Sequence, residues 1–161
     1  TGTTITGNVV GNVSGSAATV TTAAQPNITS LGTLTGLTVT GTTTLQLASD
    51  LLAVKTGATG VVVHDLTSSG VFYHTSPAAN FTANFTSVGL TSGRATTLTL
   101  VLQQGATPRF PTMGTIDGTA VTFSWQGNVL PTVTANRTDI VTFSVILSDT
   151  TYLVYGQLVS F

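Results

Sequence analysis

The residues whose side chains could do acid–base or metal chemistry are few. The chain has five aspartates, two histidines, one lysine and three arginines, and it has no cysteine and no glutamate. His64, Asp65 and His74 could be imagined as metal ligands. Two histidines without HxH or HExxH spacing are, however, a weak signal for a metal site. We therefore expect strand-borne histidines at the surface or between subunits, with no metal and no other cofactor.

Hydrolytic chemistry is also poorly supported. A glycosidase needs two carboxylates across a sugar, but Asp117 and Asp149 both lie in predicted turns, where Asp bonds its own backbone. No G-x-S-x-G elbow presents a serine nucleophile. We expect no enzyme and no catalytic or cofactor-binding residue, and we keep a carbohydrate-processing enzyme as the least favoured alternative.

Trp125, in the stretch Ser-Trp-Gln-Gly-Asn, could stack on a sugar ring. It alternates with Val121 and Phe123, which places the three side chains on one face of a strand. A tryptophan in such a row belongs more often to a core or an interface than to an exposed sugar platform. The alternation therefore predicts packing for Trp125.

The composition of the chain indicates which elements carry these residues. Charged residues make up 6% of the 161 positions, against roughly 25% in average globular proteins. Thr fills 36 positions, and this β-branched residue suits a pleated surface better than a helix. The chain lacks the clustered Lys and Arg that a duplex-DNA binder needs, and its apolar runs are too short for a transmembrane helix. We expect an all-β protein that neither binds nucleic acid nor inserts into a membrane.

Residues 61–161 show the alternating strand pattern and the turn residues of a folded head domain. Leu98, Leu100 and Leu102 alternate with polar residues, and Val141, Phe143, Val145 and Leu147 form a second inward row. Asp117-Gly118 is a hairpin signal, and Ser148 to Thr151 predicts another turn. Several strands at this spacing without helical patterns predict an antiparallel β-sandwich, jelly-roll-like in architecture.

The first 60 residues differ from the head in composition and in the length of their β-prone segments. Residues 1–44 are rich in Thr and Gly, with β-prone pieces too short to bury a core of their own. Such pieces become stable when other copies of the chain cover them, so we expect a thin β-rich stalk that trimerises. A flexible linker is the alternative. Residues 45–60 are expected to form a neck, either as a short helix, in which Leu45, Ala48, Leu52 and Lys55 would share one stripe, or as an irregular joint. Because the chain starts at Thr1 without Met, we expect a fragment or a processed product.

Residues 71–86, VFYHTSPAANFTANFT, resemble the head domain of tail-fibre and other virion structural proteins of marine phages, cyanophages especially. The pieces that strengthen this resemblance are Gln104-Gly-Ala-Thr, Ile116-Asp-Gly, Trp125-Gln-Gly, Asp139-Ile-Val-Thr-Phe and Gly156-Gln-Leu-Val-Ser-Phe161. Residues 23–41 are similar to the low-complexity repeats that precede such heads. The resemblance implies a homotrimeric fibre end in the virion, used for host attachment, and it implies no catalytic residue.

The sequence-based expectation is therefore the distal part of a phage tail fibre. It would attach the virion to a host surface glycan or protein, and join other virion proteins through chain that precedes Thr1. Receptor contacts are expected on loops around 104–114 and 126–138, although the contacting residues are not identified. The alternative is a purely architectural neck, head or baseplate fibre without a receptor.

Overall fold

The computed structural model describes residues 37–161, and one compact unit spans Gln46–Phe161. The expected stalk over residues 1–44 therefore lies almost wholly outside the described residues. The unit is all-β, as the composition predicted, and its only helical turn within this range is the short 3-10 turn η1, Gln126–Asn128. No helix in the described part of the chain is long and apolar enough to cross a bilayer.

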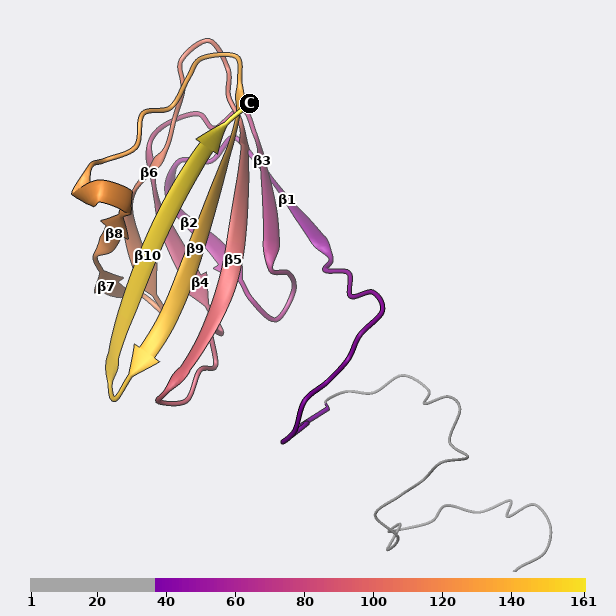
Figure 1. Ribbon diagram of the computed structural model, residues 1–161. Helices are drawn as coiled ribbons and strands as arrows, with labels where there is room; N and C mark the ends of the chain where they lie inside the picture. Colours follow the sequence, from indigo (N-terminus) through magenta and orange to yellow (C-terminus); the bar gives the residue numbers. More distant parts are fainter. Residues whose placement is uncertain (1–36) are drawn as a thin grey trace, which may run out of the picture. The chain divides into compact units, whose positions relative to one another are not determined.

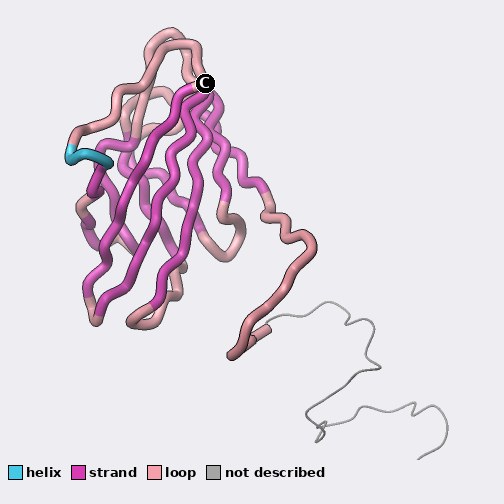
Figure 2. Tube along the Cα trace, in the orientation of Figure 1, coloured by secondary structure: helices cyan, strands magenta, loops and turns pink. Residues whose placement is uncertain are grey.

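Ten strands form two sheets that face each other as the layers of a sandwich (Figures 1 and 2). One sheet has six strands in the order β1-β3-β5-β9-β10-β8, and the other has four in the order β2-β4-β6-β7. The bounds are β1 Leu52–Thr56, β2 Gly60–Asp65, β3 Val71–Thr75, β4 Phe81–Thr86, β5 Arg94–Gln103, β6 Pro111–Ile116, β7 Thr119–Val121, β8 Phe123–Trp125, β9 Thr138–Ser148 and β10 Thr151–Ser160.

The expected antiparallel, jelly-roll-like pairing is wrong for the first half of the unit. From β1 to β6 the chain enters the two sheets alternately, so β1, β3 and β5 pair in parallel, and so do β2, β4 and β6. Each strand of one sheet serves as the crossover between two strands of the other sheet, which gives neighbours the same direction. β8 also pairs in parallel with β10. Side-chain alternation reveals a strand but not the direction of its neighbour. The sequence therefore carried no signal for this parallel pairing.

The second half matches the antiparallel expectation. β9 pairs antiparallel with both β5 and β10, and β6 pairs antiparallel with β7. Both predicted turns are confirmed: Asp117-Gly118 joins β6 to β7 with positive φ at both residues, and Asp149 has a positive φ between β9 and β10. Asp and Gly tolerate this left-handed backbone, which the right-handed twist of a tight hairpin demands.

The core lies between the sheets and follows the predicted rows. Leu98, Leu100 and Leu102 of β5 are buried, as are Val141, Phe143 and Val145 of β9. Further large side chains enter from β3 and β4, with Phe72, Phe81 and Phe85. Period-2 alternation places every second side chain on the inner face, so the sequence located this core correctly.

Residues 45–60 contain no helix, so of the two expected forms of the neck only the irregular one is compatible with residues 45–51. Residues 37–51 form neither strand nor helix, and Leu52–Thr56 form β1, paired in parallel with β3. The apparent helical stripe through Leu52 and Lys55 is instead strand alternation, with Ala53 and Lys55 half-buried and Leu52 and Val54 exposed. Tertiary pairing with β3 outweighs a weak local helical pattern.

Candidate functional site

The two loops expected to contact a receptor meet at one end of the sandwich. One loop joins β5 to β6 over residues 104–110, and the other joins β8 to β9 over residues 126–137 (Figure 1, beside the C-terminus). Their backbones bond each other directly: Gln104 N–H donates to Arg137 O at 2.8 Å, and Asn136 N–H donates to Gly105 O at 3.0 Å. The bonded residues are more than thirty positions apart in sequence, so two separate segments form one surface.

A buried glutamine holds the first loop in shape. The Gln104 side-chain amide donates to Arg109 O at 2.9 Å, and its Oε1 accepts from Arg109 N–H at 2.8 Å. The same Nε2 donates to Asp139 Oδ2 at 2.8 Å. Gln104 thus closes the loop with its side chain while its backbone N–H binds the second loop, and one residue positions the backbones of Arg109 and Arg137.

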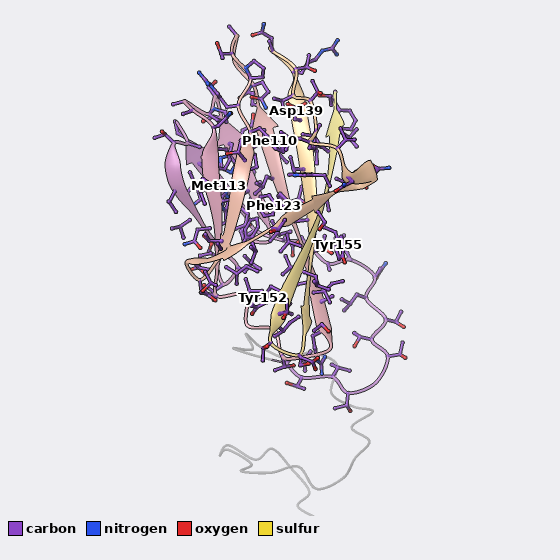
Figure 3. The ribbon with its side chains drawn as sticks, turned by 90° about the vertical axis from the view of Figure 1, so that its left-hand side faces the viewer. Phe110, Met113, Phe123, Asp139, Tyr152 and Tyr155 are labelled. Atoms are coloured by element: carbon purple, nitrogen blue, oxygen red, sulfur yellow. The ribbon has the colours of Figure 1, made fainter. Side chains whose placement is uncertain are left out.

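Asp139 lies beneath the loops and is fully buried. Its carboxylate accepts from Gln104 Nε2 and, on the other oxygen, from Ser160 Oγ. Figure 3 shows Phe110 and Asp139 toward the loop end of the sandwich and Tyr152 at the opposite end. Because a buried carboxylate is costly without donors, this cluster ties the loops to the first residues of β9 and the last of β10.

The side chains that the two loops present include hydroxyl, amide and guanidinium groups, beside the exposed Val129 and Leu130. Thr107, Thr132 and Asn136 are exposed, as is Arg137, and Arg109 is half-buried. Two of the three arginines in the chain thus lie on this end. Guanidinium groups offer several fixed donors, which suits hydroxyl-rich or anionic ligands such as surface glycans.

Alternation could have revealed the buried cluster. Gln104 continues the inward row of Leu98, Leu100 and Leu102, and Asp139 precedes Val141 and Phe143 with the same parity. A polar residue that ends an inward row is a signal for a buried polar contact at the edge of a core. The partner of each residue is not encoded locally, because Gln104 and Asp139 are 35 positions apart.

The two histidines are not at the surface or between subunits, as expected, but inside the core of this chain. His64 of β2 and His74 of β3 are fully buried, with their Nε2 atoms 2.9 Å apart, and the rings of Phe72, Phe81 and Phe85 surround them. β2 and β3 belong to different sheets, so their inward positions face each other across the sandwich.

Both imidazoles are neutral at ordinary pH. Burial, then the neighbouring His74 and Lys55, lowers the pKa of His64 to about 3. Burial, then Lys55, lowers the pKa of His74 to about 4. One Nε2–H donates to the other Nε2, and both Nδ1 atoms lack a partner. Among residues 37–161 no three His, Cys, Asp or Glu side chains come together as metal ligands.

The aspartates considered for catalysis act in turns. Asp65 Oδ1 accepts from Thr67 N–H and Oγ1, so its carboxylate does not pair with its sequence neighbour His64. Asp117 Oδ1 accepts from Ser87 N–H at 2.9 Å, and Asp149 N–H donates to Ser92 Oγ. Asp117, but not Asp149, lines the cleft of about 670 Å³, which lies away from the two loops, next to Tyr152. A glycosidase would need a second carboxylate there.

Trp125 packs as its alternation predicted. Its ring is half-buried among Phe110, Phe123 and Phe143, with ring centroids 5.0–5.7 Å away. It covers Gly156 so closely that a Cβ there would lie 2.5 Å from Trp125 Cζ3. The ring therefore closes the side of the sandwich rather than standing free as a sugar platform.

Comparison with known proteins assigns no family to the chain. The chain matches no protein-family model, no curated protein and no solved structure.

Proposed function

We propose that this chain is part of a virion fibre, the distal part of a phage tail fibre that attaches the particle to its host. The observation that carries the proposal is the exposure of large apolar side chains along the whole described chain, from Leu37 at 70% to Phe161 at 63%. A soluble monomer rarely leaves so much apolar surface in water, so such surface favours assembly with other chains. The resemblance of residues 71–86 and of the closing segment to phage fibre heads supports the same assignment.

The proposed assembly is a homotrimer that joins other virion proteins through chain preceding Thr1. Three heads per fibre, and several fibres per particle, multiply a weak affinity at each head. The loops at 104–110 and 126–137 would contact a host surface glycan or protein, because Gln104 and Asp139 hold their backbones in place. A preorganised loop loses little entropy on binding.

Binding of the labelled full chain to susceptible host cells tests the attachment role. The variant Arg109→Ala with Arg137→Ala should weaken binding at least about tenfold, since a hydrogen bond from a charged donor contributes roughly 1.5–3 kcal/mol. Arg94→Ala is the matched control, because this arginine begins β5 at the opposite end of the same strand.

Other outcomes distinguish the rivals. A wild-type chain that binds no susceptible cell, yet is required for particle assembly, would favour the architectural fibre. Turnover of host glycan by the purified chain would favour the carbohydrate-processing enzyme. Wild-type affinity in the double arginine variant would remove these loops from the contact surface.

A further inference from the structure

The outward side chains of β1, β3, β5, β9 and β10 form one continuous surface, here called the outer six-strand face. Strand register aligns an unbroken row across it: Val54 lies beside Tyr73, Tyr73 beside Val101, Val101 beside Ile140, and Ile140 beside Val159. Leu52 and Val71 extend the apolar surface on one side, and Leu153 and Tyr155 extend it on the other. Five neighbouring strands thus present large side chains outward at the same level.

The outer six-strand face carries no charged side chain. The acidic and basic residues of these strands, Lys55, His74, Arg94 and Asp139, all alternate in phase with the buried rows. The outward positions hold Val, Ile, Leu, Tyr, Thr, Ser, Ala and Gln. A surface without charge gives no electrostatic attraction to a charged partner, and two copies of it meet without like-charge repulsion.

Polar groups on this face are already partly satisfied within the chain. Tyr73 Oη donates to Gln103 Oε1 at 2.9 Å, and Thr75 Oγ1 donates to Thr56 Oγ1 at 3.1 Å. A polar group that keeps its hydrogen bond costs much less to remove from water than an unpaired one. Covering the face leaves these two bonds intact, while the other outward hydroxyl and amide groups, such as those of Thr99, Thr142 and Gln157, would have to find partners across the contact.

The face is also large enough for a stable contact. Five strands spaced about 4.8 Å apart span about 19 Å, and ten-residue strands are about 33 Å long. Because β1 and β3 have half the length of the other strands, the flat area is about 500 Å² before side-chain relief, against the roughly 800 Å² that each partner buries in a standard interface. The outer face of the four-stranded sheet is smaller, since β7 has three residues, and Asp65 lies at its end.

We propose that the outer six-strand face is the surface through which copies of this chain pack against one another. The inference rests on the assembly that the proposed function requires, and it names the surface and the partner. A second copy is the occupant that fits, because it brings the same uncharged surface, with the same apolar row and with hydroxyl and amide groups that can bond those of the first copy.

Single-cysteine variants test the proposal, because the natural chain contains no cysteine that would also react with a thiol reagent. Val159 on the outer six-strand face and Val63 on the outer face of the four-stranded sheet are both 46% exposed in the single chain. In the assembled full chain, Val159→Cys should react with a thiol reagent at least about tenfold more slowly than Val63→Cys. In denaturant the two should react at equal rates.

Light scattering on the same samples separates the possible failures. An assembled chain whose Val159→Cys reacts as fast as Val63→Cys overturns this inference and leaves the proposed fibre standing. Slower reaction at Val63→Cys assigns the contact to the other sheet and also overturns it. A full chain of monomeric mass at micromolar concentration overturns both the inference and the proposed assembly.

Discussion

At the scale of single residues, the interior contains polar groups that a purely apolar core would not need. The pair formed by His64 and His74 has one shared hydrogen bond and two unpaired Nδ1 atoms, although both rings are fully buried. Unpaired buried nitrogens cost stability. Gln104 and Asp139, by contrast, have partners on each side. The histidine pair therefore makes stability depend on pH, whereas Gln104 and Asp139 rigidify the loops.

The histidine pair predicts acid sensitivity. Folding lowers both pKa values from 6.5, to about 3 for His64 and about 4 for His74. The unfolded chain therefore binds more protons than the folded chain below pH 6.5, so stability is complete above that pH and falls as pH decreases. Between pH 6.5 and about pH 5 the free energy of unfolding should drop by about 2 kcal/mol per histidine. Denaturant unfolding at several pH values measures this slope.

The double variant His64→Leu with His74→Leu is the control for this slope. It should lose most of the pH dependence in this range and keep or gain stability at neutral pH, because apolar side chains leave no unpaired nitrogen. Equal slopes in the wild type and the variant would contradict the prediction. NMR titration of the wild-type imidazoles gives a second test, since neither ring should titrate above about pH 5.

Gln104 predicts a local effect on the loop end. Gln104→Ala removes three side-chain hydrogen bonds and leaves Asp139 with one donor fewer, so unfolding should become easier by about 3 kcal/mol. Amide exchange at Arg109 should accelerate, because its N–H loses its partner. Gln126→Ala, at an exposed position of η1, should change the free energy of unfolding by less than about 0.5 kcal/mol. Similar losses in both variants would argue against the role of Gln104.

At the scale of elements, the short segment from β7 to β8 closes one side of the sandwich. β7 pairs with β6 in the four-stranded sheet, and β8 pairs with β10 in the six-stranded sheet. The segment can change sheets at close range because two glycines lie under its aromatic rings: Phe123 covers Gly114, and Trp125 covers Gly156. Small residues opposite large ones allow β8 to approach the strands beneath it.

A methyl group at Gly156 should disturb this closure. In Gly156→Ala the new Cβ would lie 2.5 Å from Trp125 Cζ3 and 3.0 Å from Phe143 Cε1, so the rings must move. Overpacking of this kind costs about 1–3 kcal/mol. Trp125 is the single tryptophan of the chain, so its fluorescence should shift together with the unfolding midpoint. Gly105→Ala, where nothing lies within 4 Å of the new Cβ, should show neither change.

At the scale of the whole molecule, two kinds of strand pairing build one six-stranded sheet: the parallel pairing of β1, β3 and β5, and the antiparallel hairpin of β9 and β10. β5 joins the two groups by pairing with both β3 and β9, and the strand register places the outward side chains of all five strands in shared rows. The scarcity of charge, visible in the composition, thus becomes a property of one broad face. That face, rather than any single residue, is the basis of the proposed assembly of the chain with copies of itself.

The sequence by itself determined that the protein is all-β, where the longer strands lie and which side chains share a face, because alternation and turn residues are local properties of the backbone. Leu98 to Leu102 and Asp117-Gly118 were predictable for that reason. Only the tertiary structure decided the direction of pairing, the facing of His64 and His74, and the contact of Gln104 with Asp139. These depend on which sheet each strand enters, and residues far apart in sequence settle that choice together.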